Sequence, residues 1–235
     1  MSGILRGVRG LRFIDDASPA LRVVRACLAA LVVVAIVRQL FVVYDQPDPA
    51  PVNFFSFFTI QANLIAAGVW IWGAWRPASI AARPLLRGAA VTYLLITGIV
   101  YFVLSFDANK DELLALTAWW VNALTHQVLP LAIFVEWVCV APHRTIPVRV
   151  ALAWLLYPVG YFAYSMLRGF FNGWYPYPFL QPGYWHGYDG VALNALIVLT
   201  MMVPIALVVG WVGSRRARAR PLADGDKSER TTVQT

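Results

Sequence analysis

LRVVRACLAALVVVAIVRQLFVV, residues 21–43, is long and apolar enough to cross a lipid bilayer as one helix. Its charged side chains are arginines near its two ends, and a membrane span needs about 20 mostly apolar residues. The same pattern recurs in residues 54–75, 88–106, 117–140, 149–167 and 189–213. The sequence therefore predicts an all-α integral membrane protein, a six-transmembrane-helix bundle.

The composition indicates a multi-pass membrane protein rather than a soluble one. Of the 235 residues, 60% are hydrophobic and 13% are charged, whereas about a quarter of a soluble domain is charged. We find no second domain and no internal repeat. Residues 21–213 are expected to form one membrane domain in the cell membrane. A basic N-terminus (1–20) precedes it, and a polar tail (214–235) that we expect to be disordered follows.

The loops between the predicted spans alternate in charge. The N-terminus, the second and fourth loops and the tail are rich in arginine, whereas the first and third loops carry mainly Asp and Glu. Arg38, Lys110 and Arg168 lie on one side of this topology, and the other 16 of the 19 basic residues lie on the opposite side. By the positive-inside rule the more basic side is cytoplasmic, so both termini are expected in the cytoplasm.

A cleaved signal peptide is the alternative for the first span, because a basic stretch precedes it. A signal core is shorter and ends in small residues at a cleavage site. Here the apolar run continues through Leu40, Phe41, Val42 and Val43, so a retained helix is expected.

Charge and metal-ligating residues exclude several other classes. The net charge of +7 does not indicate a nucleic-acid partner, because the basic residues gather at span ends and in the tail. Cys27 and Cys139 form no Cys-x-x-Cys pair and give neither a disulfide framework nor a zinc site. His126, His143 and His186 are scattered across the topology. Because phosphate-binding, serine-hydrolase and zinc-peptidase motifs are also absent from the sequence, no metal or organic cofactor is expected.

Aromatic residues mark the predicted interfaces. Trp and Tyr gather where a span meets the head groups, and five tryptophans fit such belts: Trp70, Trp72, Trp75, Trp119 and Trp120. Residues 172–180, NGWYPYPFL, are too interrupted by proline for a helix. We interpret them as an outer loop that folds back on the bundle as a lid.

Polar side chains lie at depth on two of the predicted spans. With a rise of 1.5 Å per residue, Thr59 lies about 8 Å below the outer end of the second span, and His126 about 13 Å below that of the fourth. Both lie in the outer half of the membrane, at depths that permit contact. A titratable ring at this depth is costly and usually marks a functional site.

The neighbours of these two residues suggest chemistry. Ser56, Thr59 and Asn63 share one helix face by their i, i+3, i+7 spacing, and Asn122 lies one turn before His126. A threonine hydroxyl facing an oriented imidazole is the layout of an activated nucleophile. The structural alternative is that threonine bonds its own i−4 carbonyl, and that the asparagines join helices.

Three charged residues in or beside the spans have simpler interpretations. Glu136 lies about 15 Å beyond His126, so it is expected to pair with a basic loop residue. Arg38 is expected to reach the interface with its head group. Arg168 either does the same or holds a carboxylate head group. Arg168 ends a stripe on one face of the fifth span whose other members are Tyr157, Tyr161 and Tyr164.

Several short motifs follow one another along the chain. FFTIQAN is at residues 57–63, WVNALTHQVLP at 120–130 with Glu136 beyond it, and VGY and GWYPYPFL at 159–161 and 173–180. In order, they resemble the F-x-T-x-x-x-N/D, W-x-N-x-x-x-H…L-P…E and V-G-Y…G-x-W-x-Y-P-F-L segments of the androgen-induced membrane hydrolase family. The resemblance is that of a distant prokaryotic relative. Its leucine-proline pair lies one residue closer to the histidine, and the first and sixth spans carry no matching motif.

The resemblance implies a similar multi-pass enzyme that hydrolyses fatty-acid esters of hydroxy fatty acids with a threonine nucleophile and a histidine. Residue by residue, those roles fall on Thr59 and His126. The expected activity is hydrolysis of a lipid carboxylic ester, with His126 as general base and then acid. Asn122 is expected to orient the ring, and Asn63 or Ser56 to donate to the oxyanion.

Two other functions remain open. A small-molecule or proton-coupled transporter would use His126, Asn122 and Asn63 as part of a path across the membrane. Such a path needs polar residues that continue to the cytoplasmic side, where only Glu136 interrupts the apolar inner halves of the second and fourth spans. A non-catalytic sensor or assembly protein would tolerate apolar residues in place of Thr59 and His126.

Overall fold

The structure, a computed structural model, describes residues 14–81, 83–104, 117–184 and 187–219, and this part of the chain is helical without strands. The basic residues before position 14, the charged residues 107–112 of the third loop, His186 and the tail from 220 onward lie outside the described residues.

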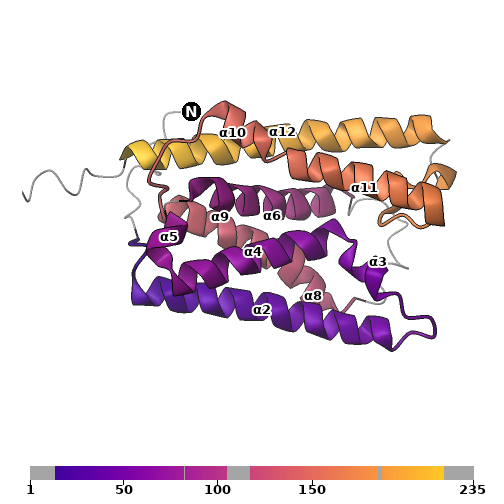
Figure 1. The fold of residues 1–235 in the computed structure, drawn as a ribbon, viewed down its shortest axis with the longest axis horizontal. Helices are drawn as coiled ribbons and strands as arrows, with labels where there is room; N and C mark the ends of the chain where they lie inside the picture. The colour runs from indigo at the N-terminus through magenta and orange to yellow at the C-terminus, as the bar shows by residue number, and fades with distance from the viewer. Residues whose placement is uncertain (1–13, 82, 105–116, 185–186, 220–235) are drawn as a thin grey trace, which may run out of the picture.

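The helices follow one another along one long axis and reverse direction from one pass to the next (Figure 1). They are α2 (Pro19–Tyr44), α3 (Pro51–Phe55), α4 (Phe58–Trp75), α5 (Pro77–Ala81), α6 (Pro84–Leu104), α8 (Trp119–Ala123), the π-helical turn η2 (Leu124–Val128), α9 (Leu129–Cys139), α10 (Val148–Ala153), α11 (Leu156–Asn172), the 3-10 turns η3 (Pro178–Leu180) and η4 (Pro182–Tyr184), and α12 (Tyr188–Ala219).

Five helical segments of the described chain are long and apolar enough to cross a membrane. They are Pro19–Tyr44, Pro84–Val103, Trp119–Cys139, Val148–Asn172 and Tyr188–Ala219. The second expected span is represented by α4, which is not among the five, because polar and tryptophan residues dilute its apolar sequence. Large apolar side chains such as Val34, Leu131 and Leu196 are exposed on the outer faces, as a lipid environment requires.

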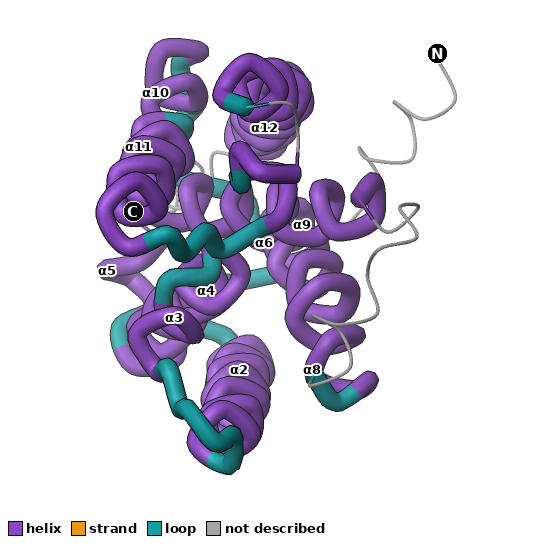
Figure 2. The backbone as a smooth tube through the Cα atoms, turned by 90° about the vertical axis from the view of Figure 1, so that its right-hand side faces the viewer, coloured by secondary structure: helices purple, strands orange, loops and turns teal. Residues whose placement is uncertain are grey.

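Helix α6 occupies the middle of the bundle. It packs against α4, α9 and α12, and α2 packs against α4. The end-on view places α2 and α12 on opposite sides of this centre (Figure 2). The fully buried side chains Val32, Leu94, Leu129 and Val209 come from four of these helices, so one core joins the first and last passes.

The expected helix at residues 54–75 is broken near its start. Ser56 ends α3, because its backbone N–H donates to Asn53 O and its hydroxyl bonds Val52 O at 2.6 Å. Phe57 then takes an extended conformation, with ψ 132°, before α4 begins at Phe58. The prediction that Ser56 shares a helix face with Thr59 is therefore wrong, since the two residues belong to different elements.

A buried ionic network lies at the end of the bundle where α2 begins and α9 ends. Arg25 is 1% exposed and donates to Glu136 Oε1 from Nε at 2.9 Å and from Nη2 at 2.7 Å. Its Nη2 also donates to Asp16 Oδ1 at 2.9 Å, and Arg87 lies beside both carboxylates. Glu136 thus pairs with Arg87, a residue of the predicted second loop, at 3.8 Å, and more closely with Arg25 of the first span.

Trp70 belongs to this network and not to an interface belt. It is fully buried, and its Nε1 donates to Glu136 Oε2 at 2.6 Å. The belt prediction for Trp70 is wrong, because a buried carboxylate needs a donor on each oxygen and the indole supplies one. Trp75 and Trp119 are 77% and 81% exposed, and their place in an interface belt stays a prediction.

Candidate functional site

Thr59 is the second residue of α4, and this position determines where its hydroxyl points. The buried threonines Thr92, Thr97 and Thr125 bond their own i−4 carbonyls at 2.8, 3.0 and 2.9 Å. Residues in the first turn of a helix lack such a helical acceptor, and the i−4 carbonyl of Thr59, Phe55 O, accepts from Gln61 instead. The break before Phe58 therefore directs the Thr59 hydroxyl elsewhere.

His126 lies on the π-helical turn η2 between α8 and α9. Pro130 lacks the N–H that would donate to His126 O in an α-helix, and its ring would clash with that carbonyl. The chain widens instead, and Leu129 N–H donates to Leu124 O, five residues back. Single π turns of this kind are frequent at functional sites.

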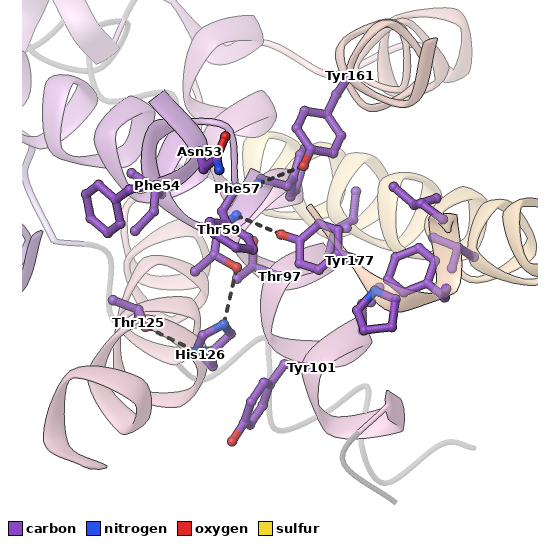
Figure 3. Close-up of a pocket in the computed structure, with 18 of the residues that line it drawn as sticks. Asn53, Phe54, Phe57, Thr59, Thr97, Tyr101, Thr125, His126, Tyr161 and Tyr177 are labelled. Atoms are coloured by element: carbon purple, nitrogen blue, oxygen red, sulfur yellow. Dashed lines mark hydrogen bonds between the residues drawn. The ribbon is translucent and has the colours of Figure 1, made fainter. Parts of the chain in front are cut away.

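The two residues meet in the structure. Thr59 Oγ1 lies 3.2 Å from His126 Nε2 (Figure 3). The other ring nitrogen, Nδ1, lies 3.1 Å from Asn122 O and 3.1 Å from Thr125 Oγ1. A backbone carbonyl only accepts hydrogen bonds, so Nδ1 carries the proton and Nε2 presents its lone pair to the Thr59 hydroxyl. This is the tautomer that a general base needs.

The expected helper Asn122 holds the ring with its backbone rather than its side chain. Its Nδ2 donates to Tyr101 OH at 2.5 Å, and the Tyr101 ring stacks on the imidazole with centroids 4.3 Å apart. Asn63 is fully buried, and its Nδ2 donates to Thr59 O and Thr125 O, at 2.8 and 3.4 Å. Asn63 therefore ties α4 to the π turn that carries His126.

Ser56 and Arg168 form a separate polar group beside the site. Arg168 donates from Nη1 to Ser56 Oγ at 2.6 Å and from Nη2 to Asn53 Oδ1 at 2.5 Å. Its guanidinium lies 4.4 Å from the ring centre of Trp174, and Tyr164 OH lies 2.9 Å from Ser56 Oγ. The groups that contact the Arg168 guanidinium, Ser56, Asn53 and Trp174, are neutral, so no carboxylate in the described part of the chain cancels its charge.

Two tyrosines that the sequence did not single out for the site cap the start of α4. Phe58 N–H donates to Tyr161 OH at 3.2 Å, and Thr59 N–H donates to Tyr177 OH at 3.4 Å. Tyr161 belongs to the aromatic stripe of α11, and Tyr177 to the proline-punctuated segment interpreted as a lid. In the sequence both tyrosines lie within motifs that were noted, Tyr161 in VGY and Tyr177 in GWYPYPFL. Only the folded chain shows that their hydroxyls reach the start of α4.

A cavity of about 990 Å³ surrounds this site. It is lined by both Thr59 and His126 and, on its other sides, by residues of α2, α6, α11, α12 and the Trp174–Leu180 region. Figure 3 shows Thr59 between His126 and Tyr177. The lining is mostly apolar side chains, which suits a lipid chain better than a sugar or a nucleotide.

An apolar layer separates this cavity from the ionic network. The buried residues of α4 between Asn63 and Trp70 are Ala66, Ala67 and Val69, and those of α9 before Glu136 are Leu129, Pro130 and Ile133. Among the described residues, neither Arg25, Asp16 nor Glu136 lines the cavity. The polar site therefore belongs to one half of the bundle.

The described residues hold no group of three or more His, Cys, Asp or Glu side chains placed to bind a metal. Comparison with protein-family models, with curated proteins and with solved structures finds no match to this chain.

Proposed function

We propose that this chain is an intramembrane hydrolase of a lipid carboxylic ester. The observation that carries the proposal is the 3.2 Å contact of Thr59 Oγ1 with His126 Nε2 inside a large apolar cavity. The proton held on His126 Nδ1 by Asn122 O supports the proposal, because Nε2 is then free to accept the proton of the Thr59 hydroxyl. The resemblance to the androgen-induced membrane hydrolases assigns the same two residues.

In the first half-reaction Thr59 becomes acylated. Its Oγ1 attacks the ester carbonyl carbon, and the Oγ1 proton passes to His126 Nε2. The carbonyl electrons move to oxygen and return as the bond to the alcohol oxygen breaks. His126 gives its proton to that oxygen, and the alcohol leaves.

In the second half-reaction water takes the place of the hydroxyl. His126 removes a proton from water, which attacks the acyl carbon. The bond to Thr59 Oγ1 breaks as His126 returns the proton to Oγ1. The products are a carboxylic acid and an alcohol, and the enzyme regains its starting protonation. The Asn122 carbonyl and Thr125 hydroxyl orient the imidazolium that forms in each half-reaction.

The orientation in the membrane follows from treating α4 as a sixth span. Its 18 residues measure about 27 Å at 1.5 Å per residue, close to the hydrocarbon thickness of about 30 Å. Both ends of the chain then lie on the arginine-rich side, which is cytoplasmic by the positive-inside rule, and Thr59 lies in the outer half of the cell membrane.

This topology is tested with single cysteines in a background where Cys27 and Cys139 are alanine. Asp48→Cys, between α2 and α3, should react in intact cells with a membrane-impermeant maleimide. Arg83→Cys, between α5 and α6, should react only after the cells are opened. Equal labelling of both sites in intact cells would refute a sixth span at α4.

The separation of the two polar regions supports an enzyme over a transporter. A transport path would need available polar groups between the cavity and the ionic network. The buried side chains that α4 and α9 contribute there are apolar, and the hydroxyl of the buried Thr92 on α6 bonds Gly88 O in its own helix. A one-sided cavity instead suits a reaction on a molecule that comes from the outer leaflet.

The proposed substrate carries a free carboxylate, as in a fatty-acid ester of a hydroxy fatty acid. Arg168 is the proposed anchor, because its guanidinium rests on Trp174 and bonds neutral oxygens. Arg168→Met should raise KM for a carboxylate-bearing ester by about tenfold or more, the worth of one charged hydrogen bond. KM for the methyl ester of the same compound is the control, and an equal rise there would assign Arg168 a structural role.

The test of the activity is labelling of the purified protein by a lipophilic fluorophosphonate. Wild type should be labelled, and Thr59→Ala and His126→Ala should not, because one lacks the nucleophile and the other its base. Thr92→Ala is the matched control: this buried threonine bonds Gly88 O in its own helix and does not line the cavity. Thermal unfolding of each variant establishes that it is folded.

Mass spectrometry of the labelled peptide then locates the phosphonate. A label on Thr59 in wild type and in Thr92→Ala supports the proposal. Labelling that survives Thr59→Ala means a different nucleophile. A folded wild type that neither reacts with the probe nor hydrolyses p-nitrophenyl octanoate would speak for the non-catalytic alternative.

A further inference from the structure

The proposed reaction places negative charge on the substrate carbonyl oxygen, and that charge needs a donor. Ser56 and Asn63 were the expected candidates. The Ser56 hydroxyl lies against Val52 O, Tyr164 OH and the Arg168 guanidinium. The Asn63 amide is fully buried and donates to Thr59 O and Thr125 O. Both side chains are thus engaged in holding protein groups rather than directed at the space beside Thr59 Oγ1.

The Tyr177 hydroxyl lies where an oxyanion donor is needed. It accepts from Thr59 N–H at 3.4 Å. By accepting from the backbone it keeps its own proton to donate. The neighbouring Tyr161 differs, because its hydroxyl already donates to Ser56 O at 2.9 Å.

The Tyr177 ring is held in place before any substrate binds. Phe57 packs edge-on against it with ring centroids 5.6 Å apart, and Phe179 stacks on it at 5.2 Å. Burial raises the pKa of the Tyr177 phenol, so the hydroxyl stays protonated at neutral pH. A fixed, neutral donor in a water-poor site stabilises developing charge more strongly than one that must reorganise.

The start of α4 adds a second contribution from the same direction. The first N–H groups of a helix have no partner within it and carry partial positive charge. In α4 they are not capped by a side chain of the Phe57 N-cap; Thr59 N–H points to Tyr177 OH instead. The N–H of Thr59 therefore holds the phenol oxygen beside the nucleophile, at the end of α4 that carries partial positive charge.

We propose that Tyr177 is a catalytic residue of this hydrolase: its hydroxyl, held by the bond that it accepts from the Thr59 N–H, donates to the oxyanion that forms when Thr59 attacks. The proposal rests on the proposed ester hydrolysis. It assigns chemistry to the segment after α11, which then completes the site as well as covering it.

The first experiment compares Tyr177→Phe with wild type in the hydrolysis of p-nitrophenyl octanoate. The change removes one oxygen and keeps the ring that packs between Phe57 and Phe179. We expect kcat to fall by about 10²–10³-fold, as for other single oxyanion donors, with KM unchanged because the donor acts on the transition state. Tyr184→Phe, the same change at an exposed tyrosine of η4, should leave both constants unchanged.

A second measurement separates this role from a structural one. An octyl trifluoromethyl ketone forms a tetrahedral adduct with a nucleophilic hydroxyl, whereas the matching ether cannot. Tyr177→Phe should weaken inhibition by the ketone in parallel with kcat and leave binding of the ether unchanged. If Tyr177→Phe does not fold, 3-fluorotyrosine at position 177 keeps the shape and changes the acidity of the donor, and kcat should change with it.

The outcomes distinguish the two proposals. If wild type is active, Thr59→Ala is inactive and Tyr177→Phe keeps its kcat, then Tyr177 is not the oxyanion donor and the hydrolase proposal stands. Equal weakening of ketone and ether binding would likewise overturn the catalytic role. A folded wild type without activity or labelling would remove the proposed function itself.

Discussion

Thr59 is so close to the start of α4 that the residue four positions before it lies outside the helix. Its hydroxyl therefore has no i−4 carbonyl of α4 to bond. The buried threonines Thr92, Thr97 and Thr125 each donate their hydroxyl proton to the carbonyl four residues back in their own helix. Thr59 reaches His126 instead, because the break at Ser56 and Phe57 removes the local alternative. One residue's place in its helix thus separates a potential nucleophile from three ordinary helix threonines.

Gly98 on α6 is expected to set the position of His126. A Cβ at Gly98 would lie 2.8 Å from His126 O and 3.2 Å from Pro130 Cβ. Gly98→Ala should therefore displace the π turn, with a cost of about 1–3 kcal/mol of stability from overpacking. Because a small misplacement of a catalytic group is costly, fluorophosphonate labelling should slow by about 10- to 10²-fold.

Gly68 on α4 provides the control for this change. A Cβ there meets nothing within 4 Å, so Gly68→Ala should stabilise the helix by up to about 1 kcal/mol and leave labelling unchanged. Labelling rates and thermal unfolding of both variants check the prediction. If Gly98→Ala labels as fast as Gly68→Ala, the close approach of α6 does not fix the histidine.

The sequence was sufficient to predict depths that permit contact between Thr59 and His126, which the structure brings together, because polar side chains in a membrane span are rare enough to stand out. It was insufficient for their partners. Asn122 acts on His126 through its carbonyl, which every residue possesses, so no side-chain pattern reveals it. Trp70 was assigned to an interface belt because its burial depends on Glu136, which lies 66 residues further along the chain.

At the scale of elements, two irregular turns shape the site. The break between α3 and α4 contains neither proline nor glycine, so no strong sequence signal marks it. The π turn η2 had a signal in Pro130, four residues after His126, since proline cannot donate to that carbonyl. The break leaves the Thr59 hydroxyl without its i−4 carbonyl, which Gln61 occupies, and the π turn carries the His126 ring.

The segment from Trp174 to Tyr184 is expected to depend on α12 for its position. Asn194 Nδ2 donates to Phe179 O at 3.2 Å, next to the ring that stacks on Tyr177. Asn194→Leu removes this donor, so chymotrypsin should cleave the segment faster in detergent and kcat should fall by about fivefold, the worth of one ordinary hydrogen bond.

Thr200→Val is the control for that variant. Thr200 is an exposed residue of the same helix whose hydroxyl bonds Ile197 O, so the change should leave both cleavage and kcat as in wild type. Unchanged proteolysis in Asn194→Leu would show that the aromatic packing alone holds the segment.

At the scale of the whole molecule, one end of the bundle carries the site and the other the ionic network, with an apolar layer between them. Glu136→Gln should lower the stability by about 3–5 kcal/mol, because Arg25 would remain buried without its main counter-charge. Labelling per folded molecule should stay as in wild type, since the network does not line the cavity.

The double variant Arg25→Met with Glu136→Met tests the reason for that loss. Replacing both charges removes the unpaired arginine and should recover most of the stability. Thermal unfolding and labelling are measured on the same samples. A double variant as unstable as Glu136→Gln would contradict the ion-pair explanation, and loss of labelling in folded Glu136→Gln would show that the two regions are coupled.

The all-helical membrane fold was predictable because long apolar runs have few other uses. Its packing was not: the central place of α6 and the burial of Arg25 arise from which helix faces meet, and hydropathy does not record this. The sequence also could not decide whether α4 crosses the membrane. Its polar and tryptophan residues make its composition intermediate between that of a span and that of a buried helix.

The pairing of Arg25 with Glu136 also constrains how the protein is made. The two residues are 111 positions apart, so α2 leaves the ribosome long before its counter-charge on α9 exists. An unpaired arginine within a membrane helix is costly, which keeps the start of α2 near the water interface at first. We expect α2 to reach its final depth only when α9 arrives, so that the two helices dock together before α10, α11 and α12 are added.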